Sequence, residues 1–287
     1  MRQVPRFYQN PHRRKFPFFP ADNPFFPEDN PSFPEDKRCA VTHFDYTLDT
    51  TKRPTLGLVV LQTDETIEQD FRRLIPTHAQ LYVSRVPSGL EVTRETLAAM
   101  EAEIPNAAAL FPAGAHFDAV GYGCTSGTSV IGTARIGALV RSGIATPHVT
   151  EPVSALVAAC AALGLRKIAF LSPYVEEVSA GLRGVLAEMG VESTVFGSFN
   201  EAEEAKVARI APDALITAAT DLAKSADVDA VFLSCTNLRT LDVIDAIETR
   251  CGKPALSSNQ VLAWHMAQLA GIGTLDALPG ALGRVSL

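Results

Sequence analysis

From residue 55 onward, short apolar runs alternate with segments of helical periodicity, and this alternation limits the fold more than any other feature. The run at 56–61 is apolar on both faces, which is typical of a strand buried in a parallel sheet. In the next segment, 66–74, Ile67, Phe71 and Leu74 fall on one side of a helix. Further strands are predicted at 80–84 and 117–122, and further helices at 93–104 and 130–141. This order predicts the α/β class, with parallel sheets covered by helices on both faces.

The second half of the chain repeats the plan. It has strands at 167–171, 191–196, 230–233 and 254–256, with helices between them. Each half places one cysteine directly after a strand, Cys124 in the first and Cys235 in the second, and the two are 235 − 124 = 111 residues apart. We therefore predict an internal duplication into two similar α/β halves, 53–150 and 151–257, each a parallel sheet flanked by helices, with each cysteine at the edge where such sheets bind ligands.

Residues 1–52 have a different composition, rich in phenylalanine and proline. Phe19-Pro20-Ala21-Asp22-Asn23-Pro24 recurs seven residues later as Phe26-Pro27-Glu28-Asp29-Asn30-Pro31. Prolines this dense exclude a helix or an inner strand, so a disordered tail is predicted. A linker and an arm that docks on a neighbouring subunit both stay open for it.

Charge and cysteine usage exclude several classes of protein. The net charge is −7, the pI is about 5.4 and the sequence has no basic stripe, so nucleic acid is not an expected partner. No apolar run is long enough to span a membrane, and the N-terminus has no signal-peptide pattern. The five cysteines form no CxxC pair and no cluster with zinc spacing. We expect a cytoplasmic protein with free thiols and no metal site.

The two cysteine loops are the candidate catalytic segments. They read Gly123-Cys124-Thr125-Ser126-Gly127 and Ser234-Cys235-Thr236-Asn237-Leu238, and each is predicted to lead into a helix. Free N–H groups at a helix start can hold a carboxylate and can lower the pKa of a thiol. One cysteine alone is more often a small buried hydrophobe, the interpretation we give Cys160. Two at equivalent turns favour catalysis.

These loops, together with Ser257-Ser258-Asn259-Gln260, resemble the Asp/Glu racemase superfamily, and within it the maleate isomerase and arylmalonate decarboxylase branch, over about residues 55–275. The resemblance implies two pseudosymmetric domains with the site between them and a C-terminal helix, within 258–287, that packs back on the first half. It also implies catalysis without a cofactor. Members of this family often form homo-oligomers, and we expect one here.

The resemblance also implies residue roles. Cys124 and Cys235 match the two catalytic cysteines; decarboxylases of this branch carry glycine at the first position, so having both favours an isomerase or racemase. Tyr174 matches a tyrosine that contacts a substrate carboxylate, and Asn200 matches a substrate-binding asparagine. The pattern departs at Asp64, where maleate isomerases carry a carboxylate-binding asparagine.

An ionised Asp64 would repel a carboxylate and suit a cationic group. Our hypothesis is an amino-acid-like substrate; the alternative is that Asp64 only caps the helix that follows. The stretch around it, Leu-Gln-Thr-Asp-Glu-Thr, also resembles ectoine-utilisation proteins, which points to a diaminobutyrate derivative.

The predicted function is an isomerase or racemase with two cysteines that transfer protons on a small carboxylate substrate. One thiolate removes the α-proton and the other thiol returns a proton to the opposite face. Backbone N–H groups and the hydroxyls of Thr125, Ser126, Thr128 and Thr236 stabilise the developing enolate. Three alternatives stay open: cis–trans isomerisation through a covalent cysteine adduct, decarboxylation of a malonate, and non-catalytic binding of a small catabolite.

Overall fold

The computed structural model describes residues 42–285, and the predicted tail lies largely outside them. Residues 42–54 form no helix or strand. Within the described range no helix is both long and apolar enough to cross a bilayer.

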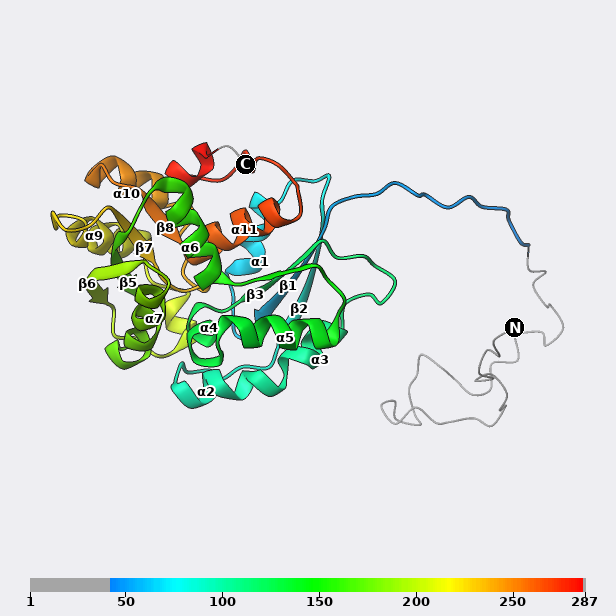
Figure 1. Cartoon of the computed structure of the whole chain (residues 1–287), viewed down its shortest axis with the longest axis horizontal. Helices are drawn as coiled ribbons and strands as arrows, with labels where there is room; N and C mark the ends of the chain where they lie inside the picture. The colour runs from blue at the N-terminus through cyan, green and yellow to red at the C-terminus, as the bar shows by residue number, and fades with distance from the viewer. Residues whose placement is uncertain (1–41, 286–287) are drawn as a thin grey trace, which may run out of the picture. The chain divides into compact units, whose positions relative to one another are not determined.

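The first half is built on a sheet of four parallel strands in the order β2-β1-β3-β4 (Figure 1). They are β1 (Thr55–Leu61), β2 (Gln80–Val86), β3 (Ala119–Gly123) and β4 (His148–Thr150). Every residue of β1 and β3 is buried, as expected for central strands covered on both faces.

The second half repeats this sheet with the same strand order, β6-β5-β7-β8, again entirely parallel. Its strands are β5 (Lys167–Ser172), β6 (Glu192–Ser198), β7 (Ala230–Leu233) and β8 (Ala255–Ser257). The identical order confirms the predicted fold of two pseudosymmetric α/β halves. It also makes β3 and β7, the strands that precede the two cysteines, equivalent.

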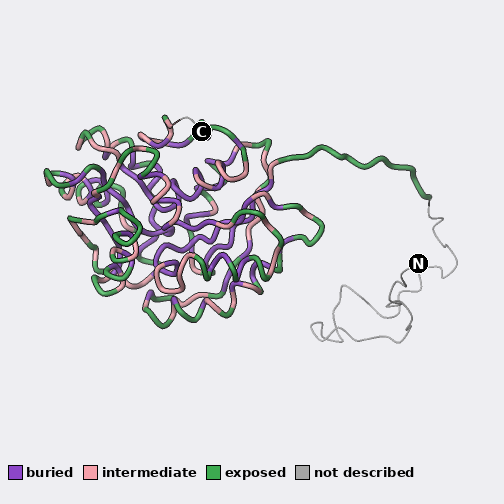
Figure 2. The backbone as a smooth tube through the Cα atoms, in the orientation of Figure 1, coloured by how far each residue is buried: buried purple, intermediate pink, exposed green. Residues whose placement is uncertain are grey.

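Helices connect the strands and cover the sheets. They are α1 (Ile67–Leu74), α2 (Arg94–Ala99), α3 (Ile104–Ala109), α4 (Thr125–Ile131), α5 (Thr133–Gly143), α6 (Pro152–Leu163), α7 (Glu176–Glu188), α8 (Glu204–Val207), α9 (Pro212–Leu222), α10 (Ile244–Cys251) and α11 (Ser258–Leu269), with 3₁₀ turns at Met100–Ala102 and Ala281–Arg284. In the first half, α3 and α5 lie on one side of the sheet and α1 and α11 on the other (Figure 1). The buried positions concentrate in the strands between these layers (Figure 2).

Three predicted helices differ from the structure. The helix expected at 93–104 breaks into α2, a 3₁₀ turn and α3, because Pro105 lacks an N–H and therefore stands in the first turn of a new helix. The helix expected at 130–141 is α4 and α5, divided at Gly132, whose φ of 95° is left-handed. In the second half, helical spacing also predicts a helix over 201–210, but the structure forms only the single turn of α8 there.

The last long helix, α11, follows the second sheet in sequence but contacts β3 and β4 of the first sheet, as well as α1 and α6. It begins at Ser258, directly after β8, and the Gln260 side chain reaches back to accept the N–H of Ser257 (3.1 Å). Its first residues therefore stand between the two halves, where they can reach both cysteine loops.

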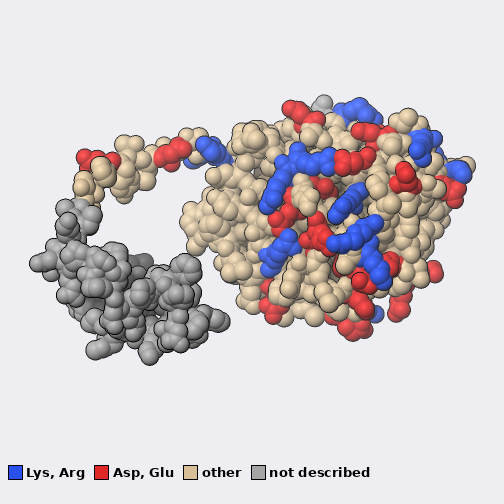
Figure 3. All heavy atoms as spheres, turned by 180° about the vertical axis from the view of Figure 1, so that it is seen from behind, with Lys and Arg blue, Asp and Glu red and all other residues tan. Residues whose placement is uncertain are grey.

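The outer surface carries charges of both signs. On the face drawn in Figure 3, lysine and arginine side chains are interspersed with aspartate and glutamate. The ion pairs of the described surface include Arg73–Asp242 and Arg209–Glu65. This face presents no continuous basic patch, in keeping with the charge pattern of the sequence.

Candidate active site

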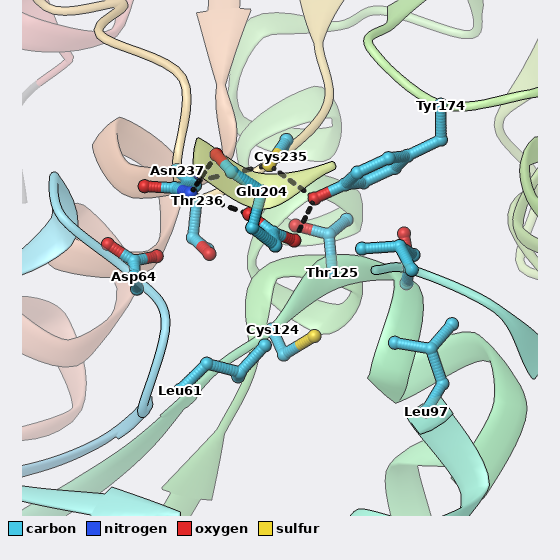
Figure 4. Close-up of a pocket in the computed structure, with 12 residues that line it drawn as sticks. Leu61, Asp64, Leu97, Cys124, Thr125, Tyr174, Glu204, Cys235, Thr236 and Asn237 are labelled. Atoms are coloured by element: carbon cyan, nitrogen blue, oxygen red, sulfur yellow. Dashed lines mark hydrogen bonds between the residues drawn. The ribbon is translucent and has the colours of Figure 1, made fainter. Parts of the chain in front are cut away.

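A small closed pocket lies where the loops that follow the strands of both sheets meet (Figure 4). Its lining residues are Leu61, Asp64, Val92, Leu97, Cys124, Thr125, Ser126, Tyr174, Glu204, Cys235, Thr236 and Asn237. The cavity volume is about 10 Å³, which is room for one water molecule. Ligands of open α/β sheets bind at this edge, and both predicted catalytic cysteines line the pocket.

Cys124 directly precedes α4 and acts as its N-cap. The backbone N–H of Gly127 donates to Cys124 Sγ over 3.2 Å. Only 5% of the residue is exposed. Burial, and to a smaller extent the negative charges of Glu204 and Asp64, raise the pKa of the Cys124 thiol to about 12, although the Gly127 N–H works in the opposite direction. The expectation that a helix start lowers this pKa is therefore wrong for the closed pocket, because desolvation outweighs one hydrogen bond.

Cys235 has a different backbone setting. No helix follows it at once, since α10 begins only at Ile244, and its φ is 141°, a conformation that L-residues rarely adopt. Its N–H donates to Ser258 Oγ (3.0 Å), and the N–H of Asn237 donates to its Sγ (3.2 Å). These bonds hold the thiol toward the pocket in a strained geometry. Burial, followed by the charge of Glu204, raises the pKa of Cys235 well above its ordinary value.

Asp64 makes the contacts of one of the two roles considered for it, holding the start of α1. Its Oδ1 accepts from the N–H groups of Thr66 and Ile67, each at 2.8 Å, and so caps α1. Its Oδ2 is buried and has no hydrogen-bond partner in the described structure. The Thr236 hydroxyl lies close enough to Asp64 to stabilise its ionised form, which acts to lower the pKa of Asp64. The hydroxyl itself donates to the carbonyl oxygen of Gly123 (3.3 Å). Burial raises the pKa of Asp64. One oxygen therefore holds the loop at the start of α1, and the other has no hydrogen-bond partner among the described residues.

Glu204 is a site residue that the sequence analysis missed, as is Asn237. It is 4% exposed, and its carboxylate accepts from the Tyr174 hydroxyl (2.7 Å) and from the side-chain amide of Asn237. Burial raises its pKa. Glu204 belongs to an acidic stretch of the sequence, which is typical of a solvent-exposed helix surface. Its charge therefore gave no indication that it is buried in the site. Its spacing of three and four residues from Val207 and Ala208, both fully buried, is the signal that places it on the inner face.

Polar contacts join the two cysteine loops to each other and to α11. Thr125 Oγ1 donates to Ser258 Oγ (2.8 Å), the atom that also receives the N–H of Cys235. The Asn259 side-chain amide donates to the carbonyl oxygen of Thr236 (2.7 Å). The Ser258-Asn259 pair thus holds the N–H of Cys235 and the carbonyl group of the next residue, Thr236, which supplies a physical role for this motif.

Asn237 joins the two halves. Its Oδ1 accepts the N–H of Glu65 (2.9 Å), its carbonyl oxygen accepts the Thr66 hydroxyl (2.9 Å), and its amide nitrogen donates to Glu204. The loop that carries Asp64 and the segment that carries Glu204 are therefore positioned by the same side chain.

The other predicted substrate-binding residues divide into two groups. Thr125, Ser126, Tyr174 and Thr236 line the pocket, as Asp64 does. Thr128 and Asn200 do not. The Thr128 hydroxyl donates to the carbonyl oxygen of Cys124 (2.6 Å) inside α4, and Asn200 is exposed, with a left-handed φ of 54°.

Gly127 permits a close approach inside the first cysteine loop. A Cβ at this position would stand 2.9 Å from both Cys124 Sγ and Tyr122 Oη. We expect Gly127→Ala to lower the free energy of unfolding by about 1–3 kcal/mol, because buried neighbours cannot move aside freely. Thermal denaturation would measure the change. In the matched variant Gly137→Ala, the new Cβ meets only the far end of Arg141 (3.2 Å) within a helix, and equal stability of the two variants would contradict the steric argument.

Comparison with known proteins agrees with this architecture. The sequence is 29% identical over 233 residues to the arylmalonate decarboxylase of Bordetella bronchiseptica, covering 79% of this chain and 94% of that protein. It is 25% identical over 249 residues to the maleate isomerase of Geobacillus stearothermophilus, covering 79% and 96%.

Solved structures show the same fold. The maleate isomerase Iso from Pseudomonas putida S16 superposes with a TM-score of 0.71 at 22% identity, over 81% of this chain and 97% of that one. A crystal structure of arylmalonate decarboxylase superposes with a TM-score of 0.64 at 26% identity, over 81% and 100%. The model of the arylmalonate decarboxylase family matches residues 134–285. The chain therefore belongs to the arylmalonate decarboxylase family, in the branch of the Asp/Glu racemase superfamily that it shares with the maleate isomerases.

Proposed function

We propose that this protein inverts the configuration at the α-carbon of a small amino-acid-like acid, with Cys124 and Cys235 as the two proton-transfer groups. The observation that carries the proposal is the composition of the pocket. Two thiols share it with two buried carboxyl groups, Asp64 and Glu204, and no lysine or arginine is among the described residues that line it.

The two thiols suit proton transfer on opposite faces of a carbon. They follow equivalent strands of the two halves, and Figure 4 shows Cys235 above and Cys124 below the side chains of Glu204 and Thr125. A substrate carbon between them would meet one sulfur on each face. One thiolate removes the α-proton, and the other thiol donates its own proton from the far side.

The carboxyl groups define the class of substrate. A substrate with two carboxylates would bring two more negative charges beside Asp64 and Glu204, and like charges in a desolvated site repel strongly. A substrate with an ammonium group would instead pair with the unbonded Oδ2 of Asp64. A diaminobutyrate derivative, to which the ectoine-utilisation resemblance points, meets this requirement and is the first compound to test.

Substrate access requires a change at one wall. The segments that carry Val92 and Glu204 are joined by backbone hydrogen bonds, from the Val92 N–H to the Ala202 carbonyl (3.0 Å) and from the Glu204 N–H to the Leu90 carbonyl (3.1 Å). With room for one water, the pocket must open here or nearby before an amino acid enters.

The direct test is proton NMR of the purified protein in heavy water. The panel contains both enantiomers of diaminobutyrate derivatives and of common amino acids, together with maleate and an arylmalonate. We expect loss of the α-proton signal of a cationic amino acid, accompanied by loss of optical activity. Conversion of maleate to fumarate would establish cis–trans isomerisation instead, and release of carbon dioxide from the malonate would establish decarboxylation. Tight binding of a compound without any exchange would establish the non-catalytic alternative.

A further inference from the structure

A continuous line of hydrogen bonds leads from the thiol of Cys235 to the carboxylate of Glu204. Tyr174 Oη stands 2.9 Å from Cys235 Sγ and 2.7 Å from Glu204 Oε1. All three residues are at most 4% exposed. Figure 4 shows the phenol directed between the other two groups. Nothing in the inversion mechanism itself requires this arrangement.

The direction of the bonds follows from the inventory of donors. Glu204, when ionised, can only accept, so the Tyr174 hydroxyl hydrogen is committed to it. Tyr174 Oη then has only lone pairs to offer to Cys235, and the S–H must be the donor. The three groups form a thiol–phenol–carboxylate chain with each hydrogen pointing toward Glu204.

We propose that Glu204 is the acceptor of the Cys235 proton and that Tyr174 passes it on. The S–H bond breaks and its proton moves to Tyr174 Oη, while the Tyr174 hydroxyl proton moves to Glu204 Oε1. The products are a thiolate, an intact phenol and a neutral carboxylic acid. The proposal rests on the proposed function only for the use to which the thiolate is put.

The charge balance explains why such an acceptor is needed. Adding a second negative charge to a buried site is costly, because desolvation and the existing anion both oppose it. The transfer leaves the charge of the Cys235–Glu204 pair at one negative unit and only changes its position. Burial raises the pKa of both groups, and the charge of Glu204 opposes ionisation of Cys235 only while Glu204 is itself ionised.

The contacts of Glu204 support its role as the group that accepts and holds the proton. The side-chain amide of Asn237 donates to Oε2 of Glu204 and so holds the carboxyl group in place. Oε1 of Glu204 is left to interact with Tyr174. The other titratable groups facing the pair are Asp64 and Cys124, from the loops after β1 and β3. If Glu204 served only as a counterion for the substrate, it would need no hydrogen-bonded connection to the thiol of Cys235.

The test is the alkylation rate of Cys235 with iodoacetamide, a small neutral reagent, followed by peptide mass mapping in the full-length protein without substrate. The rate is measured between about pH 7 and pH 9. As long as the pair holds one shared proton, the thiolate fraction that comes from internal transfer does not depend on pH. We expect a nearly flat rate in the natural protein. In Glu204→Gln the thiol must lose its proton to solvent, so the rate should rise about tenfold per pH unit.

Two further variants complete the design. Glu203→Gln changes the neighbouring, solvent-exposed carboxylate that pairs with Lys206, and its profile should stay flat. Tyr174→Phe removes a hydrogen bond to the thiolate and should slow alkylation at neutral pH about tenfold. It also tests the chain separately should Glu204→Gln fail to fold.

A natural protein whose rate rises tenfold per pH unit, as in Glu204→Gln, would overturn the proposal, and so would an unchanged rate in Tyr174→Phe. Because no substrate is present, these results are independent of whether α-proton exchange is found. Failure of the proposed function and failure of the proton acceptor can therefore be distinguished.

Discussion

Replacing either pocket cysteine, by Cys124→Ala or by Cys235→Ala, should lower the rate of inversion by about 10²- to 10⁴-fold, the usual contribution of one general acid–base group. Inversion needs a base on one face and an acid on the other, so the loss of either sulfur stops the overall reaction. Polarimetry with a cationic amino acid would measure it.

The two variants should differ in what they retain. Each variant still has one thiol in the pocket. That thiol can exchange the α-proton of the enantiomer whose α-proton points toward it. We expect exchange with heavy water, without inversion, for opposite enantiomers in the two variants. Cys160→Ala is the matched control, since Cys160 is as deeply buried but lies in α6 and does not line the pocket. Full inversion activity in either pocket variant would show that the two-thiol mechanism is wrong.

The second large effect is expected from Asp64→Asn, which exchanges one pocket charge for an amide. We expect kcat/KM for a cationic amino acid to fall about tenfold to a hundredfold, as for the loss of one hydrogen bond to a charged group. Repulsion of a second carboxylate should weaken at the same time, so maleate should bind better. Activity assays with both compounds, on the same preparation, would measure the change in preference.

The fold should tolerate this change. Asparagine caps a helix as well as aspartate does, and an amide oxygen can still accept from the N–H groups of Thr66 and Ile67. Glu65→Gln, which alters the adjacent exposed carboxylate paired with Arg209, provides the control for charge alone. An unchanged ratio of the two activities in Asp64→Asn would remove the argument for a cationic substrate.

The local sequence pattern was sufficient to predict most of the fold. Apolar runs of strand length, helical spacing and the recurrence of a cysteine after equivalent strands predicted two similar α/β halves, and the sheets have identical strand order. It failed where one residue redirected the backbone. Pro105 and Gly132 divided helices whose apolar spacing continues across them. After Cys235 the chain forms a turn, because its peptide groups bond to Ser258 and Asn259 of a distant helix.

The sequence by itself determined the α/β class and the place of each cysteine directly after an equivalent strand, the edge where open α/β sheets bind ligands. That Cys124, Cys235 and Asp64 share one site was implied by the family resemblance. Only the tertiary structure decided the rest. It brought Glu204 and Tyr174 to the thiol and left Asn200 at the surface. It also raised the thiol pKa values, because desolvation depends on how many neighbours surround a group, and no local pattern records that.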